Sequence, residues 1–510
     1  MRGAIIFLLI NYCAFLFSQP LQGIVYSRDY PAARGNIPLH IINNHPNYFF
    51  LLRYNKPAHE FVVERRSKPE GRMLSFTPLK MDSINASWFD YENLDYLLFE
   101  SNNRLCFVFE KVLNTRRAVY IKTIDTLGKS SGFKELATLD KDEGTSHFRF
   151  TMKVTATNKL LLIGEQFYTS YTSKKVALLY DPVKNKNVWV KKLPLENYLT
   201  GFSSVFECSQ DNDLFYVQEC RSLIGFQRRY INSQQIMVPV LSSDSLFLAC
   251  MPGDTKTFFR RKLNLRDSTG IKSLILSPSA NSIGVFINAC RQNEAEDGRV
   301  FFMTQQFEKD LQKELTYAIT PLNEDVNRKL TFYDGSDYKS PADKFHDQAQ
   351  VFRNTESSFI LAGRVEGTYY KELLLWKTDL ESGRVISQQV VPRKIFFFAG
   401  RTQFKNIGFT ASILNNGNFY TFLLEHRNNR HTGAQDFRFN KFSRQRSVSG
   451  GNLVAYILNA DDSFEKKEIY RSIALNFIPV NYQGSGDDFV FYLNKGKKEK
   501  FAILNLRLLR

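Results

Sequence analysis

The chain has 510 residues, 43% of them hydrophobic and 23% charged, so its composition excludes wholesale disorder and allows a large buried core. An aromatic fraction of 14%, with 45 Phe and 24 Tyr, favours strands over helices. The formal net charge of +17 indicates either an anionic partner or a surface with many solvated lysines and arginines.

The chain begins with the pattern of a secretory signal peptide. Residues 1–18 place one arginine before an apolar run and end in a small residue. This run is shorter than the roughly 18 to 20 residues that a bilayer span requires, so an uncleaved anchor is the weaker interpretation. We therefore expect an exported protein without a transmembrane span, in the periplasm or at the outer-membrane or cell surface. Export also argues against a nucleic-acid partner for this basic chain.

Nearly every segment after about residue 36 has the pattern of a β-strand. Short runs rich in aromatic and β-branched residues are bounded by Asn, Asp, Gly, Ser or Pro. Residues 308–319 contain helix formers, but they follow a strand and could equally form a polar hairpin tip. We predict an all-β fold. The clearest strand runs are 48–55, 60–66, 105–112, 117–125, 147–157, 213–219, 245–250, 299–307 and 488–494.

A unit of three strands occurs twice. Within residues 161–194, one strand runs into Gly164, the next ends in Asp181 and the third ends in Pro194. Residues 360–392 repeat this order, and the matching Asp and Pro both lie 198 residues further along the chain. An Asp followed by residues that accept a positive φ suits the tight turn of an antiparallel hairpin.

Further copies of this unit indicate a repeat architecture. Fainter versions occupy 116–140 and 452–470, and the residues that follow the two clear copies also resemble each other, 200–219 with 406–425. A single hairpin buries little, whereas blades packed on their neighbours share one core.

The repeats predict one β-propeller-like domain over residues 19–510, with about seven or eight blades of antiparallel strands. The final strand, 500–508, is expected to pair with an early strand.

The order of strand, Gly, strand ending in Asp, turn, and strand ending in Val-Pro is followed by the run GFTASILNNGNFYTFLLEHRNN. This pattern resembles a group of uncharacterised exported proteins of Bacteroidota that are propeller-like. The resemblance is strongest over residues 355–510 and weaker over 155–220. It implies export and a β fold, and it carries no catalytic residues across.

The cysteines do not suggest a disulfide framework. Five remain after the leader, so at least one is unpaired or pairs with another chain. Each lies in or beside an apolar run, as buried cysteines commonly do. A bridge between Cys208 and Cys220 is the most plausible exception, because their spacing suits a strand hairpin.

The sequence contains no catalytic motif in its expected structural context. G-x-S-x-G occurs once, at residues 128–132, but in a predicted hairpin turn rather than between a strand and a helix. H-E-x-x-H and C-x-x-C are absent, and the histidines are scattered. Acidic loops at 293–298, 333–347 and 484–488 offer oxygen ligands, but none matches the twelve-residue calcium loop, so we predict solvated hairpins and no metal or cofactor. Two carboxylates brought together by folding leave no sequence pattern, so enzymatic activity stays open. We predict no catalytic residue.

The basic segment 426–446 is the strongest binding candidate. It holds six Arg or Lys against one acid and interleaves three Phe. Guanidinium groups beside aromatic faces suit anionic sugars or acidic peptides. The alternative is an ordinary strand with a solvated basic face. The candidate anion-binding residues are Arg427, Arg430, His431, Arg438 and Lys441.

These observations predict an exported, non-enzymatic binding or scaffold protein of the bacterial cell envelope, with a protein or an anionic glycan as partner. Two alternatives stay open. One is a polysaccharide-active enzyme that uses loop carboxylates. The other is a peripheral envelope protein that binds anionic glycan or lipid through a basic face.

Overall fold

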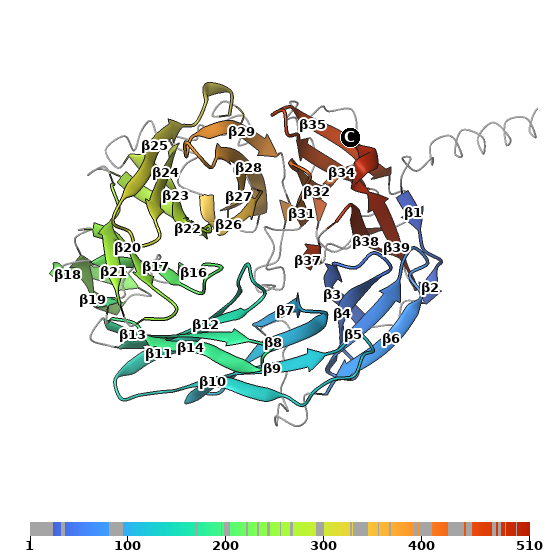
Figure 1. The fold of residues 1–510 in the computed structure, drawn as a ribbon, viewed down its shortest axis with the longest axis horizontal. Coiled ribbons are helices and arrows are strands. Elements are labelled where there is room, and N and C mark those ends of the chain that lie inside the picture. The colour runs from blue at the N-terminus through green and yellow to red at the C-terminus, as the bar shows by residue number, and fades with distance from the viewer. Residues whose placement is uncertain are drawn as a thin grey trace, which may run out of the picture. The chain divides into compact units, whose positions relative to one another are not determined.

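The computed structural model describes most of the chain after its first 23 residues. The regular elements include strands β1 to β39, a short helical segment that contains residues 324–326, and a short 3₁₀ helix at Leu506–Leu509 (Figure 1). Among the described residues, no helix is long and apolar enough to cross a membrane. The described residues are 24–31, 36–80, 95–168, 172–194, 196–197, 205–220, 223–231, 234–241, 245–255, 257–265, 269–291, 300–326, 329, 345–354, 356–366, 369–391, 395–396, 411–426, 443–444, 451–471, 476–477, 481–484, 486–495 and 497–509.

The chain divides into two compact units. Unit 1 comprises Met1–Asn93, Asn323–Asp379 and Val385–Arg510, and unit 2 comprises Leu94–Leu322 and Leu380–Arg384. The single domain over 19–510 stays a prediction.

Unit 2 contains four antiparallel sheets of propeller type, which we number as blades 2 to 5 in chain order. A separate hairpin, β18 (Leu223–Ile231) with β19 (Gln234–Leu241), interrupts blade 4. The strands are β7 (Tyr96–Ser101), β8 (Arg104–Val112), β9 (Arg116–Ile124) and β10 (Lys134–Asp140) in blade 2; β11 (Thr145–Val154), β12 (Leu160–Tyr168), β13 (Thr172–Asp181) and β14 (Lys186–Lys192), with β15 (Glu196–Asn197), in blade 3; β16 (Phe206–Cys208), β17 (Leu214–Cys220), β20 (Ser245–Met251) and β21 (Phe259–Lys262) in blade 4; and β22 (Thr269–Pro278), β23 (Ser282–Arg291), β24 (Val300–Glu308) and β25 (Glu314–Pro321) in blade 5.

Unit 1 contains four further sheets, blades 1, 6, 7 and 8. Their strands are β3 (Asn36–Asn43), β4 (Tyr48–Asn55), β5 (Glu60–Ser67) and β6 (Met73–Leu79), with β37 (Asn481–Gly484), in blade 1; β26 (Phe345–Arg353), β27 (Ser357–Glu366), β28 (Tyr369–Asp379) and β29 (Val385–Val391), with β30 (Ile395–Phe396) and β33 (Ser443–Arg444), in blade 6; β31 (Ala411–Asn415), β32 (Asn418–His426), β34 (Gly451–Leu458) and β35 (Phe464–Arg471) in blade 7; and β36 (Asn476–Phe477), β38 (Asp488–Lys495), β39 (Lys498–Asn505) and β1 (Ile24–Tyr26), with β2 (Tyr30–Pro31), in blade 8. The predicted all-β, β-propeller-like fold class is confirmed, and the described sheets supply eight blades.

The second strand of each blade is buried on both faces. In β12, Leu160 and Leu162 pack against blade 2, whereas Leu161 and Ile163 pack against blade 4. A strand covered on both sides is an unbroken apolar run rather than an alternating one, which explains the LLLI sequence of this strand. Blades 4 and 5 share a core in the same way, and in unit 1 so do blades 6 and 7, 7 and 8, and 8 and 1.

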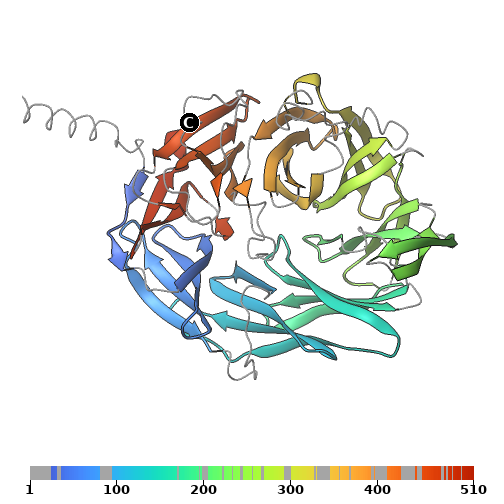
Figure 2. The same ribbon diagram turned by 180° about the vertical axis from the view of Figure 1, so that it is seen from behind.

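The two ends of the described chain meet in blade 8. Strand β1 pairs antiparallel with β39, where Ile24 lies opposite Leu504 and Tyr26 opposite Ala502. Figures 1 and 2 both show β1, in blue, beside the red strands of the C-terminus. Late residues also join an early sheet, because β37 runs parallel to β3. The predicted pairing of the final strand with an early strand is confirmed.

The repeated unit seen in the sequence corresponds to strands two to four of a blade. The first copy is β12 to β14, and the second is β27 to β29. Asp181 shapes its turn as predicted, because its Oδ1 accepts hydrogen bonds from the backbone N–H groups of Val183, at 2.9 Å, and Lys184, at 3.1 Å. Residues 308–319 do not form a helix: 309–313 are the tip of the β24–β25 hairpin, and 314–319 belong to β25.

The suggested bridge between Cys208 and Cys220 is wrong. Cys208 pairs with Leu214 in the short hairpin of β16 and β17, and its thiol is free and buried. Cys220 lies at the far end of β17, about 20 Å along the strand from Leu214. A disulfide requires Cα atoms within about 7 Å. Burial raises the pKa of the Cys208 thiol to about 12, so this cysteine is inert at neutral pH.

Candidate functional site

A pocket of about 440 Å³ lies within unit 1. Three segments border it: the end of β26 in blade 6, the turn from β31 to β32 in blade 7, and β37 at the edge of blade 1. The lining residues are Phe352, Arg353, Asn354, Ser412, Ile413, Leu414, Asn416, Gly417, Tyr482, Gln483 and Gly484.

Part of the wall is apolar and held by the shared core of blades 6 and 7. The Phe352 ring meets the buried Phe419 ring edge to face, with centroids 5.0 Å apart. Ile413 is itself buried, and Leu414 packs against the same core. These contacts fix the apolar part of the pocket before any ligand arrives.

Tyr482 is the second aromatic residue of the lining. Its ring stacks on Phe489 at a centroid distance of 4.0 Å. Its hydroxyl accepts a hydrogen bond from Asn43 Nδ2 at 2.9 Å, and burial raises the pKa of the phenol. The hydroxyl therefore stays protonated at neutral pH and holds the ring in place. Gly484 must be glycine here, since a Cβ at this position would lie 2.7 Å from the Tyr482 hydroxyl oxygen.

The turn from β31 to β32 supplies the polar rim. Asn416 and Gly417 have φ values of 48° and 79°, which suit the tight hairpin turn that an Asn-Gly pair favours. The Asn416 side-chain amide donates to Asp487 Oδ1 at 3.3 Å, and the Asn415 amide donates to the Gly486 carbonyl at 2.6 Å. Blade 8 therefore positions the rim contributed by blade 7.

Asp487 of the acidic run 484–488 makes contacts within the protein. Besides the bond from Asn416, Asp487 Oδ1 accepts one from Asn415 Nδ2 at 3.3 Å, and Asp487 Oδ2 pairs with Arg507 Nη2 at 2.5 Å. No group of three or more His, Cys, Asp or Glu in the described part of the chain is placed to hold a metal ion.

Arg353 is the only charged side chain among the described residues that line the pocket. It ends β26, and its Nε donates to Ser358 Oγ, 3.3 Å away on the paired strand β27. Ser358 is fully buried, so this bond ties the guanidinium to the core of blade 6. Burial lowers the pKa of Arg353, but arginine keeps its charge at any physiological pH.

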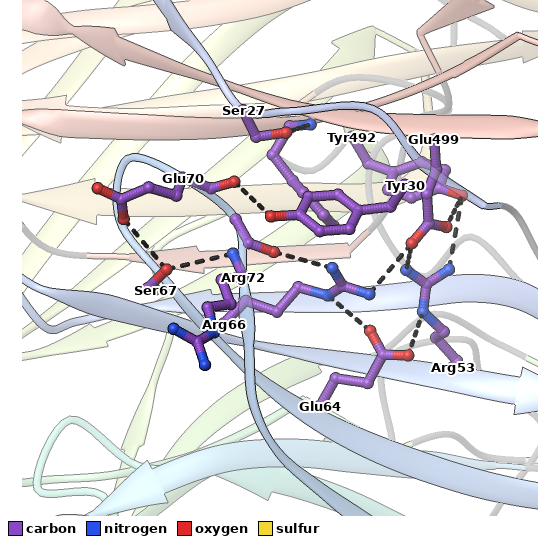
Figure 3. A network of polar contacts seen from close by, with 12 residues as sticks. Ser27, Tyr30, Arg53, Glu64, Arg66, Ser67, Glu70, Arg72, Tyr492 and Glu499 are labelled. Atoms are coloured by element: carbon purple, nitrogen blue, oxygen red, sulfur yellow. Dashed lines mark hydrogen bonds and ion pairs between the residues drawn. The ribbon is translucent and has the colours of Figure 1, made fainter.

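A second polar cluster in unit 1 joins blades 1 and 8 (Figure 3). Arg53 contacts Glu64 at 2.9 Å and Glu499 at 2.8 Å, and Arg66 contacts the same two carboxylates at 2.7 and 3.1 Å. The Tyr492 hydroxyl donates to the second oxygen of Glu499 at 2.8 Å. All four charged side chains are at most 6% exposed, so this cluster is structural.

The charged form of Arg53 is stabilised by its partners in this cluster. Burial alone would lower the pKa of Arg53, but Glu64, Tyr492 and Glu499 more than offset that effect and raise it. Because each carboxylate contacts both arginines, the cluster is neutral and closed on itself.

Unit 2 buries two carboxylates in neighbouring blades. Glu165 of blade 3 contacts Arg149 Nε at 2.8 Å and Lys175 Nζ at 3.5 Å. Glu110 of blade 2 contacts Arg117 at 3.1 Å and accepts a hydrogen bond from the backbone N–H of Phe150. The two carboxylate side chains are 0% and 5% exposed, so neither is positioned to meet a substrate.

The binding residues expected from the sequence are not tested by the structure. Arg427, Arg430, His431, Arg438 and Lys441 lie outside the described residues, as does the acidic loop 293–298. Sequence reasoning missed Arg353 and Tyr482, because neither belongs to a motif.

The comparisons with known proteins concern the fold alone. No protein-family model matches the chain, and no curated protein matches it. Among solved structures, the polysaccharide lyase Uly1 aligns with 96% of this chain and 100% of its own at 10% identity and a TM-score of 0.41. An α-L-arabinanase of Penicillium chrysogenum aligns with 83% of this chain and 96% of its own, at 10% identity and a TM-score of 0.34. Dipeptidyl peptidase 4 of Porphyromonas gingivalis aligns over 90% of this chain and 60% of its own, at 8% identity and a TM-score of 0.35.

Proposed function

We propose that this chain is an exported binding protein of the bacterial cell envelope and that the pocket of unit 1 binds a short stretch of glycan. The observation that carries the proposal is the combination of side chains in that pocket. The rings of Phe352 and Tyr482 offer flat apolar walls, and the Asn354 and Gln483 amides and the Ser412 hydroxyl offer donors and acceptors. A sugar ring has the same combination of apolar faces and a hydroxyl rim, and most ligand sites share this design.

The lining favours binding over hydrolysis. Glycoside hydrolysis usually requires two carboxyl groups on either side of the bond that breaks. None of the described lining residues is Asp, Glu or His. The Tyr482 hydroxyl is held protonated and cannot act as a base near neutral pH. The export expected from the sequence and its resemblance to propeller-like proteins of Bacteroidota also support the proposal.

A polysaccharide-active enzyme is the second candidate. Its carboxylates would come from loops such as 293–298. The proteins of similar fold include a polysaccharide lyase and an α-L-arabinanase, so glycan turnover belongs in the same experiment as glycan binding.

The experiment combines a glycan array with calorimetry on the mature chain and two tryptophan variants. Gln483→Trp fills the pocket from β37, so it should abolish binding while the thermal midpoint stays close to that of the wild type. Val190→Trp is the matched control, because Val190 is 56% exposed on blade 3 and does not line the pocket.

Glycan binding that Gln483→Trp leaves unchanged, or no binding by the wild type to any glycan, would overturn the proposal. The appearance of new reducing ends or unsaturated products would favour the enzyme instead.

A further inference from the structure

The polar rim of the pocket is held by residues that do not line it. Asn416 and Gly417 border the cavity at the turn from β31 to β32. Asp487 is not among the described lining residues, but its Oδ1 accepts hydrogen bonds from Nδ2 of Asn416 and of Asn415, both at 3.3 Å. The Gly486 carbonyl accepts another from Asn415, at 2.6 Å. The turn is therefore fastened to the residues just before β38.

Asp487 is held in turn by the C-terminal 3₁₀ helix, Leu506–Leu509. Its Oδ2 pairs with Arg507 Nη2 at 2.5 Å, and its backbone carbonyl accepts a hydrogen bond from the N–H of Leu506 at 2.6 Å. One oxygen of the carboxylate therefore contacts the arginine while the other contacts the turn. Because the ion pair restricts the rotation of the carboxylate, it also fixes the oxygen that the turn contacts.

The sequence LRLL explains why this helix is a firm support. A 3₁₀ helix has roughly three residues per turn, so Leu506 and Leu509 lie on the same side. Both are buried in the shared core of blades 7 and 8, and Lys467 Nζ donates to the Leu509 carbonyl. Of the four residues, only Arg507 and Leu508 are exposed. The core therefore anchors the helix and leaves its charge at the surface.

The ion pair is the most exposed contact in this series. The Arg507 side chain is 66% exposed, and that of Asp487 is 28% exposed. Salt screens an exposed pair, whereas a hydrogen bond to Asp487 Oδ1 needs the oxygen and not the partner arginine. Salt, or a change of charge at residue 507, therefore acts on Asp487 first and on the pocket rim through it.

We propose that Asp487 and Arg507 are positioning residues of the pocket and that the charge of the C-terminal helix sets how tightly the pocket holds a glycan. Both act on the β31–β32 turn, and a displaced turn would move Asn416 and Gly417 away from the ligand. This inference rests on the proposed function and concerns the regulation of the same site. It predicts that even an uncharged glycan binds less tightly at high salt.

The first measurement requires no ligand. Hydrogen exchange, followed by mass spectrometry on the peptide that contains residues 415–418, reports how often the turn opens. Asp487→Ala removes the acceptor of both side-chain amides and should speed exchange about tenfold or more. Arg507→Gln leaves that acceptor in place and should speed exchange about two- to fivefold. Arg507→Lys keeps the charge and should restore most of the protection.

Lys498→Gln is the matched control for Arg507→Gln. Lys498 belongs to the same unit, is 67% exposed and pairs with Asp29 at 3.4 Å. Its loss removes an equally exposed ion pair and the same net charge, so exchange in residues 415–418 should not change. Raising NaCl from about 0.01 M to about 1 M should speed exchange in the wild type but add nothing in Arg507→Gln.

The second measurement is calorimetry with two uncharged probes, arabinohexaose and cellohexaose. For a probe that binds, Arg507→Gln should weaken binding about two- to fivefold, Arg507→Lys should restore it, and Lys498→Gln should leave it unchanged. Binding by the wild type should weaken with salt to the level of Arg507→Gln.

The outcomes distinguish this inference from the proposed function. Equal exchange in the wild type and Arg507→Gln at both salt concentrations overturns the inference while glycan binding stands. Faster exchange with unchanged affinity also overturns it, because the turn would then move without affecting the ligand. No binding on the glycan array removes the proposed function, whereas faster exchange in Arg507→Gln still supports control of the turn by the helix.

Discussion

Each of the two units buries charges, but it does so in a different way. In unit 1, Arg53 and Arg66 are 2% and 5% exposed and share the buried carboxylates of Glu64 and Glu499 (Figure 3). In unit 2, Glu165 contacts Lys175, which is fully buried, and Arg149, which is 43% exposed. Both cations of the first cluster are therefore sealed, whereas one of the two cations of the second is open to solvent.

The difference decides what happens when a carboxylate is removed. Arginine does not release its proton, so a sealed arginine without a partner keeps an uncompensated charge in the interior. A half-exposed arginine can be hydrated instead. Removing a carboxylate from a sealed arginine should therefore lower the free energy of unfolding more than removing one from a half-exposed arginine.

Of the three Glu→Gln substitutions considered, Glu499→Gln should lower the free energy of unfolding most. Both sealed arginines lose a carboxylate partner, which we expect to lower the free energy of unfolding by about 3–5 kcal/mol. Urea denaturation followed by tryptophan fluorescence measures the loss. Tyr492→Phe is the matched control, because it removes one hydrogen bond to the same carboxylate and leaves the charges paired. A loss for Glu499→Gln no greater than that of the control would show that the cluster is not sealed.

Glu165→Gln should lower the free energy of unfolding by an intermediate amount, about 1–3 kcal/mol. The Arg149 side chain can rotate into solvent, and the new amide oxygen can still accept a hydrogen bond from Lys175, which is fully buried. The same denaturation experiment measures it, with Arg149→Gln as the companion variant. We expect the companion to cost less, since it removes only the half-exposed partner. A loss for Glu165→Gln equal to that for Glu499→Gln would contradict the distinction between the clusters.

Glu110→Gln should change the free energy of unfolding least, and the sign of that change should depend on pH. Burial raises the pKa of Glu110, although Arg117 partly opposes the shift. The native state then holds a proton more tightly than the unfolded chain, whose Glu titrates near pH 4.3. The wild type therefore loses stability as pH rises from about 4 through the raised pKa, and the variant does not.

The measurement for Glu110→Gln is the difference in urea midpoint between variant and wild type at pH 4 and at pH 7. The difference should move in favour of the variant between pH 4 and pH 7. A shift in the opposite direction would mean that the pairing with Arg117 outweighs burial.

The strands were predictable from the sequence, and their partners were not. The predicted run 48–55 is β4, and 488–494 matches β38 to within one residue, because aromatic and β-branched runs between turn residues leave few other choices. The charges inside those strands were not predictable as buried. Arg53 and Glu64 each follow an unbroken apolar run, and a charged residue at such a place normally faces solvent. Both are buried here, because the blade is covered on both sides.

The pocket was less predictable than the fold. Arg353, Ser412 and Tyr482 come from three distant segments, and no local pattern distinguishes them from other strand ends. The one nearby signal was the acidic run 484–488, which was predicted to be a solvated hairpin, whereas Asp487 accepts a hydrogen bond from Asn416 and pairs with Arg507. A site assembled from several blades depends on which strands become neighbours, and one sequence contains that information only weakly.

The pairing of β1 with β39 determines the order in which blade 8 can form. Residues are synthesised from the N-terminus onward, so Ile24–Tyr26 are made long before Lys498–Asn505. Blade 8 therefore stays incomplete while the blades between these two segments are synthesised, and it gains its β1–β39 ladder only when β39 becomes available.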